Sequence, residues 1–124
     1  EAALKLKEVS YIQTEGFAAA ELKHGTIALI EKDTPVIALL NDPKTADLTR
    51  GNIKEVQARG AEVVTIASKS LSYPDDDVVL PEVAYELTPL LSVVTAQLLA
   101  YYASKNKGLN VDQPRNLAKA VTVE

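Results

Sequence analysis

The only histidine of this 124-residue chain stands where the sequence predicts a loop. His24 precedes Gly25, and a glycine frees the backbone to leave regular structure. Because histidine titrates near neutral pH, His24 could act as a general acid or base. Composition by itself favours a simpler interpretation, an exposed or hydrogen-bonded loop side chain.

Lys5 and Glu8 are three residues apart in a segment with helical spacing, so their side chains share one helix face. A carboxylate beside an ammonium could be a base with an electrostatic helper. A surface ion pair has the same spacing and contributes about 0–1 kcal/mol to stability. The spacing alone favours the ion pair.

Lys119 lies between Ala118 and Ala120, close to the end of the chain. A lysine in apolar surroundings can form a Schiff base with a ketone, although a solvated lysine is the simpler interpretation.

The run 75–77 is three aspartates, which could suggest a cation site. Aspartates without spaced partners make a poor cage, so a solvated loop is favoured. The chain has no glycine-rich phosphate loop, and no metal or organic cofactor is expected.

Composition argues against several classes of function. The net charge of -4 disfavours a nucleic-acid binder, which needs clustered Lys and Arg. The chain contains no cysteine, which excludes disulfides, thiolate zinc sites and a cysteine nucleophile within it. The most apolar stretch, Leu90–Ala103, is interrupted by polar residues and is shorter than the roughly 20 residues of a membrane span. We therefore expect no membrane segment.

Short apolar runs that alternate with helical patterns predict an α/β fold with a parallel sheet. The expected elements are a helix over 1–14, a helical turn over 17–23, strands over 35–40, 62–67 and 78–80, and helices over 43–59 and from Thr88 to about Lys105. Asp42 should cap the middle helix, with Pro43 at its first position, and Gly60 should close it. The last helix is apolar nearly all round, so we expect protein to cover both its sides.

Two features predict a piece of a larger protein. The chain has no methionine, and its first helix begins without a residue that could cap it. Three strands are also few for a parallel sheet, and no strand precedes the first helix. We expect at least one upstream strand.

Three stretches read together resemble a known family. They are Glu1–Ile12 (EAALKLKEVSYI), Ala20–Gly25 (AELKHG) and Val111–Lys119 (VDQPRNLAK), followed by the terminal VTVE. With them the whole chain resembles the C-terminal part of the glucosamine-6-phosphate synthase family, the glutamine:fructose-6-phosphate amidotransferases. Members of that family join a glutaminase domain to two sugar-isomerase (SIS) lobes.

The resemblance implies a flavodoxin-like three-layer αβα sandwich with a parallel sheet. Residues 1–108 would be the second SIS lobe without its first strand, and residues 109–124 an active-site tail. It also implies a cytoplasmic homodimer that converts fructose 6-phosphate to glucosamine 6-phosphate for hexosamine synthesis. The remaining partners would be the glutaminase domain and the first SIS lobe, without nucleic acid or membrane.

The resemblance assigns roles by position. Glu8 matches the glutamate that moves a proton between C1 and C2 of the sugar, and Lys5 the lysine that stabilises negative charge on the enediol. His24 matches the histidine that opens the sugar ring from the neighbouring subunit. Lys119 matches the Schiff-base lysine, and Ala118 a residue that lines the site beside it.

Departures from the family limit what this chain should do alone. It lacks the Ser/Thr-rich phosphate loop of the first lobe and the glutaminase cysteine, so we expect the isolated chain to be inactive. Gln13 and Ala120 replace a common histidine and serine that have no chemical role. The alternatives are a non-catalytic sugar-phosphate-binding SIS module, which needs no Lys119, and a dimerisation domain, which needs neither Glu8 nor Lys5.

Overall fold

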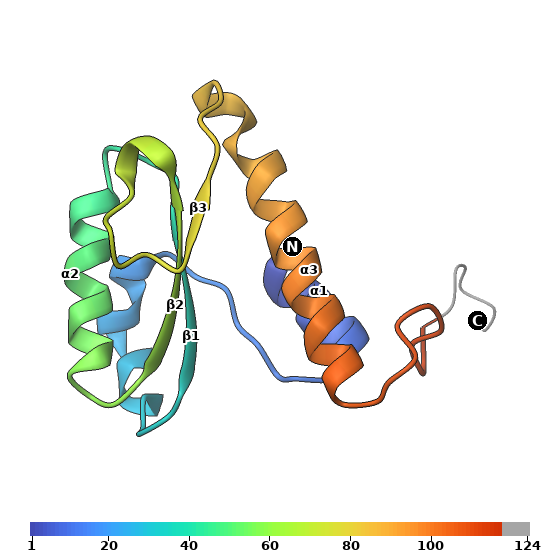
Figure 1. Cartoon of the computed structure of the whole chain (residues 1–124). Helices are drawn as coiled ribbons and strands as arrows, with labels where there is room; N and C mark the ends of the chain where they lie inside the picture. The colour runs from blue at the N-terminus through green and yellow to red at the C-terminus, as the bar shows by residue number, and fades with distance from the viewer. Residues whose placement is uncertain (118–124) are drawn as a thin grey trace, which may run out of the picture. The chain divides into compact units, whose positions relative to one another are not determined.

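The computed structural model describes residues 1–117 and divides them into two compact units (Figure 1). One unit consists of residues 17–92. The other consists of residues 1–16 together with residues 93–117.

The unit of residues 17–92 is built on a parallel sheet. β1 (Pro35–Leu40), β2 (Glu62–Ser68) and β3 (Val78–Leu80) lie in that order, with Leu39 opposite Ile66 and Ile66 opposite Val78. Their short apolar sequences are typical of parallel strands that other elements cover. The expected α/β fold with a parallel sheet is confirmed.

One face of this sheet packs against α2 (Ala46–Gln57), which connects β1 to β2. The core there consists of buried apolar side chains from both elements: Leu40, Ala46, Ile53 and Ala67. A second buried cluster joins Val56 of α2 and Ala61 to Leu22, which comes from a short 3-10 helix over Ala19–His24. That short helix is therefore held on α2, and it carries His24 at its end.

Gly60 ends α2 in a left-handed conformation, with φ of 98°. The N–H of Ala61 donates to the carbonyl of Val56, and the N–H of Gly60 to that of Gln57, so two carbonyls that the helix leaves open are satisfied. A Cβ at this position would lie 2.9 Å from the Cα of Lys32. The predicted closing role of Gly60 is confirmed, and the position tolerates only glycine.

The unit of residues 1–16 and 93–117 contains α1 (Ala2–Ser10) and most of α3 (Thr88–Asn106). The end of α3 lies beside the end of α1 (Figure 1), where the Ser104 hydroxyl donates to the Val9 carbonyl at 2.7 Å. α3 ends at Gly108 as α2 does at Gly60, with φ of 69° and the N–H of Leu109 donating to Ser104.

The buried side of α3 is a stripe of small residues at four-residue intervals: Ser92, Ala96, Ala100 and Ser104. Several of its large apolar residues are exposed instead: Leu90, Val94, Leu98, Tyr101 and Tyr102. Within the described residues these side chains are uncovered, so the expectation that protein covers both sides of this helix stays a prediction for the larger protein. Small side chains let a helix approach its neighbours closely, so this buried stripe is the most closely packed side of α3.

Among the described residues, one segment, Tyr85–Asn106, is long and apolar enough to cross a membrane by length and composition. It includes the stretch that we expected to be too short, because the helical residues at both ends extend it. Packed helices of soluble proteins have the same composition, so this is weak evidence for a span.

Two predicted helices begin or end elsewhere. α1 ends at Ser10 rather than near residue 14, because Tyr11 adopts a left-handed conformation with φ of 59°. α2 begins at Ala46 rather than at residue 43. Asp42 caps a turn instead of the helix, since its Oδ1 accepts the N–H of Lys44 at 2.9 Å. β1, β3 and α3 lie close to the predicted ranges.

Candidate active site

Lys5 and Glu8 form an ion pair on α1. The Nζ of Lys5 lies 2.5 Å from Oε2 of Glu8, and 3.8 Å from Oε1 of Glu1. The two side chains are 33 % and 25 % exposed, so the pair is partly buried. The expected convergence of Lys5 and Glu8 on one helix face is confirmed.

The hydrogen bond to Glu8 is the main cause that raises the pKa of Lys5 above its usual value of 10.5; burial acts in the opposite direction, and the charges of Glu8 and Glu1 add to the increase. A raised pKa favours the ammonium form in the folded chain. The stabilisation is therefore complete below pH 10.5 and disappears as the pH rises through the folded value. At neutral pH Lys5 is a cation that can stabilise negative charge, and it is not a free amine.

Lys5 also borders a hollow of about 370 Å³ in the same unit. Its walls are mostly apolar, with Val9 from α1, Leu98 and Tyr101 from α3, and Val111 from the segment beyond α3. Among the described residues, Lys5 is the only charged residue in this lining.

His24 lies at the end of the short 3-10 helix in the other unit, followed by Gly25 with φ of 134°. Leu22 is buried and Lys23 pairs with Glu55 of α2 at 2.7 Å, so the two preceding side chains fix this turn. The imidazole itself is 73 % exposed, with Nδ1 at 3.1 Å from a carboxylate oxygen of Glu21. His24 is therefore held at the surface and accessible to another molecule.

Two of the predicted site residues, Ala118 and Lys119, lie outside the described residues. The last part of the chain that the structure describes, up to Leu117, belongs to the unit that carries Lys5 and Glu8. The structure thus joins Lys5 to Glu8, describes His24 in the other unit, and leaves the roles of Ala118 and Lys119 as predictions.

The carboxyl ends of β1 and β2 carry polar side chains that bond to one another. Asn41 donates from its amide to the hydroxyl of Ser92, and Ser68 donates to the amide oxygen of Asn41 at 3.3 Å. This edge is where α/β sheets often bind ligands. The three bonded side chains, Asn41, Ser68 and Ser92, do not titrate. Their hydrogen bonds join the strand ends to the first turns of α3.

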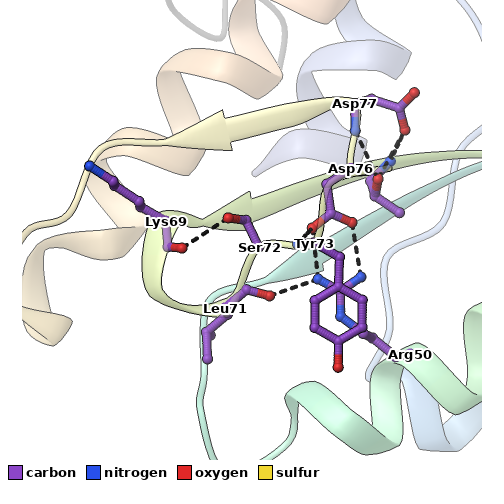
Figure 2. Close-up of polar contacts among 8 residues, drawn as sticks. Arg50, Lys69, Leu71, Ser72, Tyr73, Asp76 and Asp77 are labelled. Atoms are coloured by element: carbon purple, nitrogen blue, oxygen red, sulfur yellow. Dashed lines mark hydrogen bonds and ion pairs between the residues drawn. The ribbon is translucent and has the colours of Figure 1, made fainter.

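The aspartate run contains a buried ion pair that the sequence did not reveal. Figure 2 shows Asp76 facing Arg50 of α2, whose Nη1 and Nη2 donate to its two carboxylate oxygens at 2.9 and 2.7 Å. The Tyr73 ring lies 3.7 Å from the guanidinium carbon, and Arg50 also donates to the Leu71 carbonyl. The Asp76 side chain is only 2 % exposed.

The expectation of a solvated loop is therefore wrong for Asp76. Asp77 is also bonded, because its Oδ2 accepts the N–H and the hydroxyl of Thr65 at 2.7 and 2.9 Å. No group of three potential metal ligands occurs among the described residues. One signal in the sequence was missed: Arg50 lies on the same helix face as Ala46 and Ile53, and an arginine in a buried stripe needs an anionic partner.

Removing this partner tests the ion pair. Asp76→Asn should lower the free energy of unfolding by about 3–5 kcal/mol, because it leaves the guanidinium of Arg50 buried without a counter-charge. Urea unfolding followed by circular dichroism measures the loss. The neighbouring variant Asp75→Asn is the control, and its change should stay within about 0.5 kcal/mol.

The pH dependence of the same pair is a second readout. The hydrogen bond from Arg50 is the main cause that lowers the pKa of Asp76 from 3.8 to about 2. Its contribution to stability is present above pH 3.8 and is lost as the pH falls through about 2. Between those values the wild-type chain should therefore lose more stability than Asp76→Asn. Parallel losses would contradict the ion pair.

The comparison with known families decides what kind of domain this is. Residues 1–106, which include the sheet, α1, α2 and α3, match the family described as the SIS domain. The chain belongs to that family. As a SIS domain, it has relatives that can be compared over its whole length.

Curated proteins with high similarity to this SIS domain share one name, glutamine–fructose-6-phosphate aminotransferase (isomerizing). The protein of that name from Lactiplantibacillus plantarum is 67 % identical over 124 residues, and that from Streptococcus pneumoniae is 64 % identical over 124 residues. Both matches cover 100 % of this chain but only 20 % and 21 % of the relatives. The chain thus spans about a fifth of their length.

Two solved structures share the fold. The C-terminal domain of glucosamine-fructose-6-phosphate aminotransferase from Francisella tularensis has a TM-score of 0.80 at 36 % identity, and the match covers 90 % of this chain and 33 % of that one. Glucosamine-6-phosphate deaminase from Thermotoga maritima has a TM-score of 0.79 at 27 % identity, with 97 % and 35 % covered. Both of these proteins are named for glucosamine and a sugar 6-phosphate.

Proposed function

We propose that this SIS domain is the C-terminal isomerase part of a glutamine–fructose-6-phosphate aminotransferase. The complete enzyme would convert fructose 6-phosphate and ammonia from glutamine to glucosamine 6-phosphate. The supporting comparison is the sequence identity to proteins of that name, which is above 60 % over all 124 residues. The observation that carries the chemistry is the Lys5–Glu8 pair on α1.

Glu8 is the proposed base of the isomerisation. Moving a proton between C1 and C2 requires one group that reaches both carbons, and a single carboxylate can accept the proton from one and return it to the other. The enediol that forms between the two steps gathers negative charge. Lys5, held as an ammonium by Glu8, is the proposed group that stabilises that charge.

Lys119 is the proposed nucleophile. Its neutral amine would attack the C2 ketone of fructose 6-phosphate, and loss of water would leave an imine between Nζ and C2. This role requires an unprotonated amine, whereas Lys5 is kept protonated. The two lysines would therefore have opposite functions in one site, with Ala118 lining it beside Lys119.

His24 is the proposed acid–base group for ring opening, and we assign it to the site of a neighbouring subunit in a homodimer. Its imidazole is exposed on a turn that Leu22 and Lys23 fix. An exposed titratable group on a rigid turn can serve a second molecule without rearrangement. The dimer itself is part of this proposal.

The remaining functions belong to other parts of the proposed enzyme. The sequence contains no cysteine, so a cysteine-dependent glutaminase must be elsewhere. Of the residues that the structure describes, only Lys5 brings a positive charge to the hollow, so we assign the sugar phosphate mainly to a first SIS lobe. We place the enzyme in the cytoplasm, where its phosphorylated substrates occur, and assign it no metal or organic cofactor.

Trapping the imine tests the proposal. Borohydride added to the full-length enzyme with fructose 6-phosphate should attach a reduced hexose phosphate to Lys119, located by peptide mass spectrometry. Lys105, an exposed amine at the end of α3, should stay unlabelled in the same digest. Binding of the sugar phosphate without any adduct would instead indicate a non-catalytic sugar-phosphate-binding module.

A further inference from the structure

Tyr11 holds a backbone conformation that is unusual for its side chain. It follows α1 with φ of 59° and ψ of 23°, in the left-handed region. Glycine or asparagine normally occupies such a position, and other residues incur about 1–2 kcal/mol there. Strain of this kind persists where the surrounding contacts determine the conformation, so those contacts are informative.

The Tyr11 side chain makes two contacts with one residue near the end of the described chain. Its hydroxyl oxygen accepts the backbone N–H of Arg115 at 2.7 Å. Its ring lies 4.2 Å from the guanidinium carbon of the same arginine. Asn116 follows with φ of 61°, so the chain turns immediately after this contact. Arg115 is thus fixed through both its backbone and its side chain.

Two further bonds fix the end of α3 to the end of α1. The Ser104 hydroxyl and the Lys107 ammonium donate to the carbonyls of Val9 and Ser10, each at 2.7 Å. These are carbonyls that the last turn of α1 leaves open, and a lysine suits the negative end of a helix. The segment from residue 104 to 115 is therefore bonded at three points to the last turn of α1 and to Tyr11.

Covalent geometry then limits the position of the proposed nucleophile. Lys119 is four residues beyond Arg115, and four residues extend at most about 14 Å. Glu8 lies on α1, three residues before Tyr11, and three helical residues rise by about 4.5 Å. While Tyr11 holds Arg115, the covalent reach of the Lys119 amine is limited to four residues of chain and one lysine side chain beyond Arg115.

We propose that Tyr11 is a positioning residue for the isomerase reaction. By binding the segment before Lys119 to the end of α1, it keeps the amine of Lys119 and the carboxylate of Glu8 near one substrate. This raises the effective concentration of the amine at the sugar ketone. The inference rests on the proposed function, because it requires Lys119 to be the nucleophile.

The test uses the full-length enzyme and the variant Tyr11→Phe. This variant keeps the ring and its stacking on Arg115 but removes the oxygen that accepts the backbone N–H. We expect the rate of borohydride trapping at Lys119 and kcat to fall together by about five- to tenfold, the size of one lost hydrogen bond. The KM for fructose 6-phosphate should change less than twofold, since the phosphate contacts are elsewhere.

Tyr73→Phe is the matched control, because Tyr73 also stacks on an arginine but lies in the other unit, where its ring and N–H hold Arg50 and Asp76. It should keep wild-type trapping and turnover. Arg115→Gln keeps the backbone N–H, and it should lower both rates less than Tyr11→Phe does. Thermal unfolding of each variant shows whether a lost rate only reflects a smaller folded fraction.

The outcomes separate the two claims. Wild-type trapping and kcat in Tyr11→Phe, or losses fully explained by unfolding, would overturn the positioning role while leaving the Lys119 adduct intact. An adduct absent from the wild-type enzyme would overturn the proposed function, and the positioning role with it. Slower trapping at an unchanged site, with normal stability, supports both.

Discussion

Lys119→Ala in the full-length enzyme is expected to lower synthase turnover by at least about a thousandfold. In the proposed mechanism no imine forms at C2 without this amine, so the reaction loses its covalent step. Steady-state formation of glucosamine 6-phosphate measures the loss. Glutamine hydrolysis, which needs a separate nucleophile, should continue in the variant at a measurable rate.

The control for this variant is Lys105→Ala, which removes another lysine from the C-terminal part of the chain. Lys105 is exposed at the end of α3, and its loss should leave turnover within about twofold of wild type. Full turnover in Lys119→Ala would exclude a Schiff base at this position. A similar loss in both variants would indicate damage to the fold rather than to the chemistry.

Glu8→Gln should lower turnover by about 10²–10⁴-fold, the usual contribution of a general base. The amide has the shape of the carboxylate and can still accept a hydrogen bond from Lys5, but it cannot carry the proton between C1 and C2. Exchange of the C1 or C2 hydrogen with deuterated water should therefore disappear. Borohydride trapping at Lys119 should persist, because imine formation does not depend on this proton transfer.

Glu1→Gln is the matched control for Glu8→Gln, since Glu1 is the other carboxylate near Lys5 on α1, at 3.8 Å. It should reduce turnover less than threefold, because the partner at 2.5 Å remains. Deuterium exchange that continues in Glu8→Gln would contradict the assignment of the base. Trapping and exchange that vanish together would indicate that Glu8 acts before the imine forms.

Local signals predicted much of the fold. β1 and β3 are short apolar runs between turn residues, and their ranges agree with the sequence pattern. Gly60 could be identified because glycine is the usual residue at a left-handed helix end. The end of α1 could not be identified from the sequence. Ile12 continues the apolar spacing beyond Ser10, and no local signal shows that Tyr11 adopts a left-handed conformation. That turn depends on Arg115, more than a hundred residues away.

In the candidate site, too, local spacing could be predicted from the sequence and long-range contacts could not. The pairing of Lys5 with Glu8 could be predicted from their spacing, since one turn of helix brings such residues together. Their chemical roles could not, because an ordinary surface ion pair has the same pattern; those roles come from resemblance to a family. The Arg50–Asp76 pair joins residues 26 positions apart through a turn between two strands, so only the tertiary structure reveals it.

The row of serines and alanines along α3 restricts which sequences can preserve the geometry around Glu8. Ala100 is only 1 % exposed, so a larger side chain there would crowd its neighbours and displace the helix. Four residues on, the Ser104 hydroxyl would move with it and pull on the last turn of α1. Since displacements of about 1 Å can slow an enzyme a hundredfold, an inert alanine can be as intolerant of exchange as a reacting group.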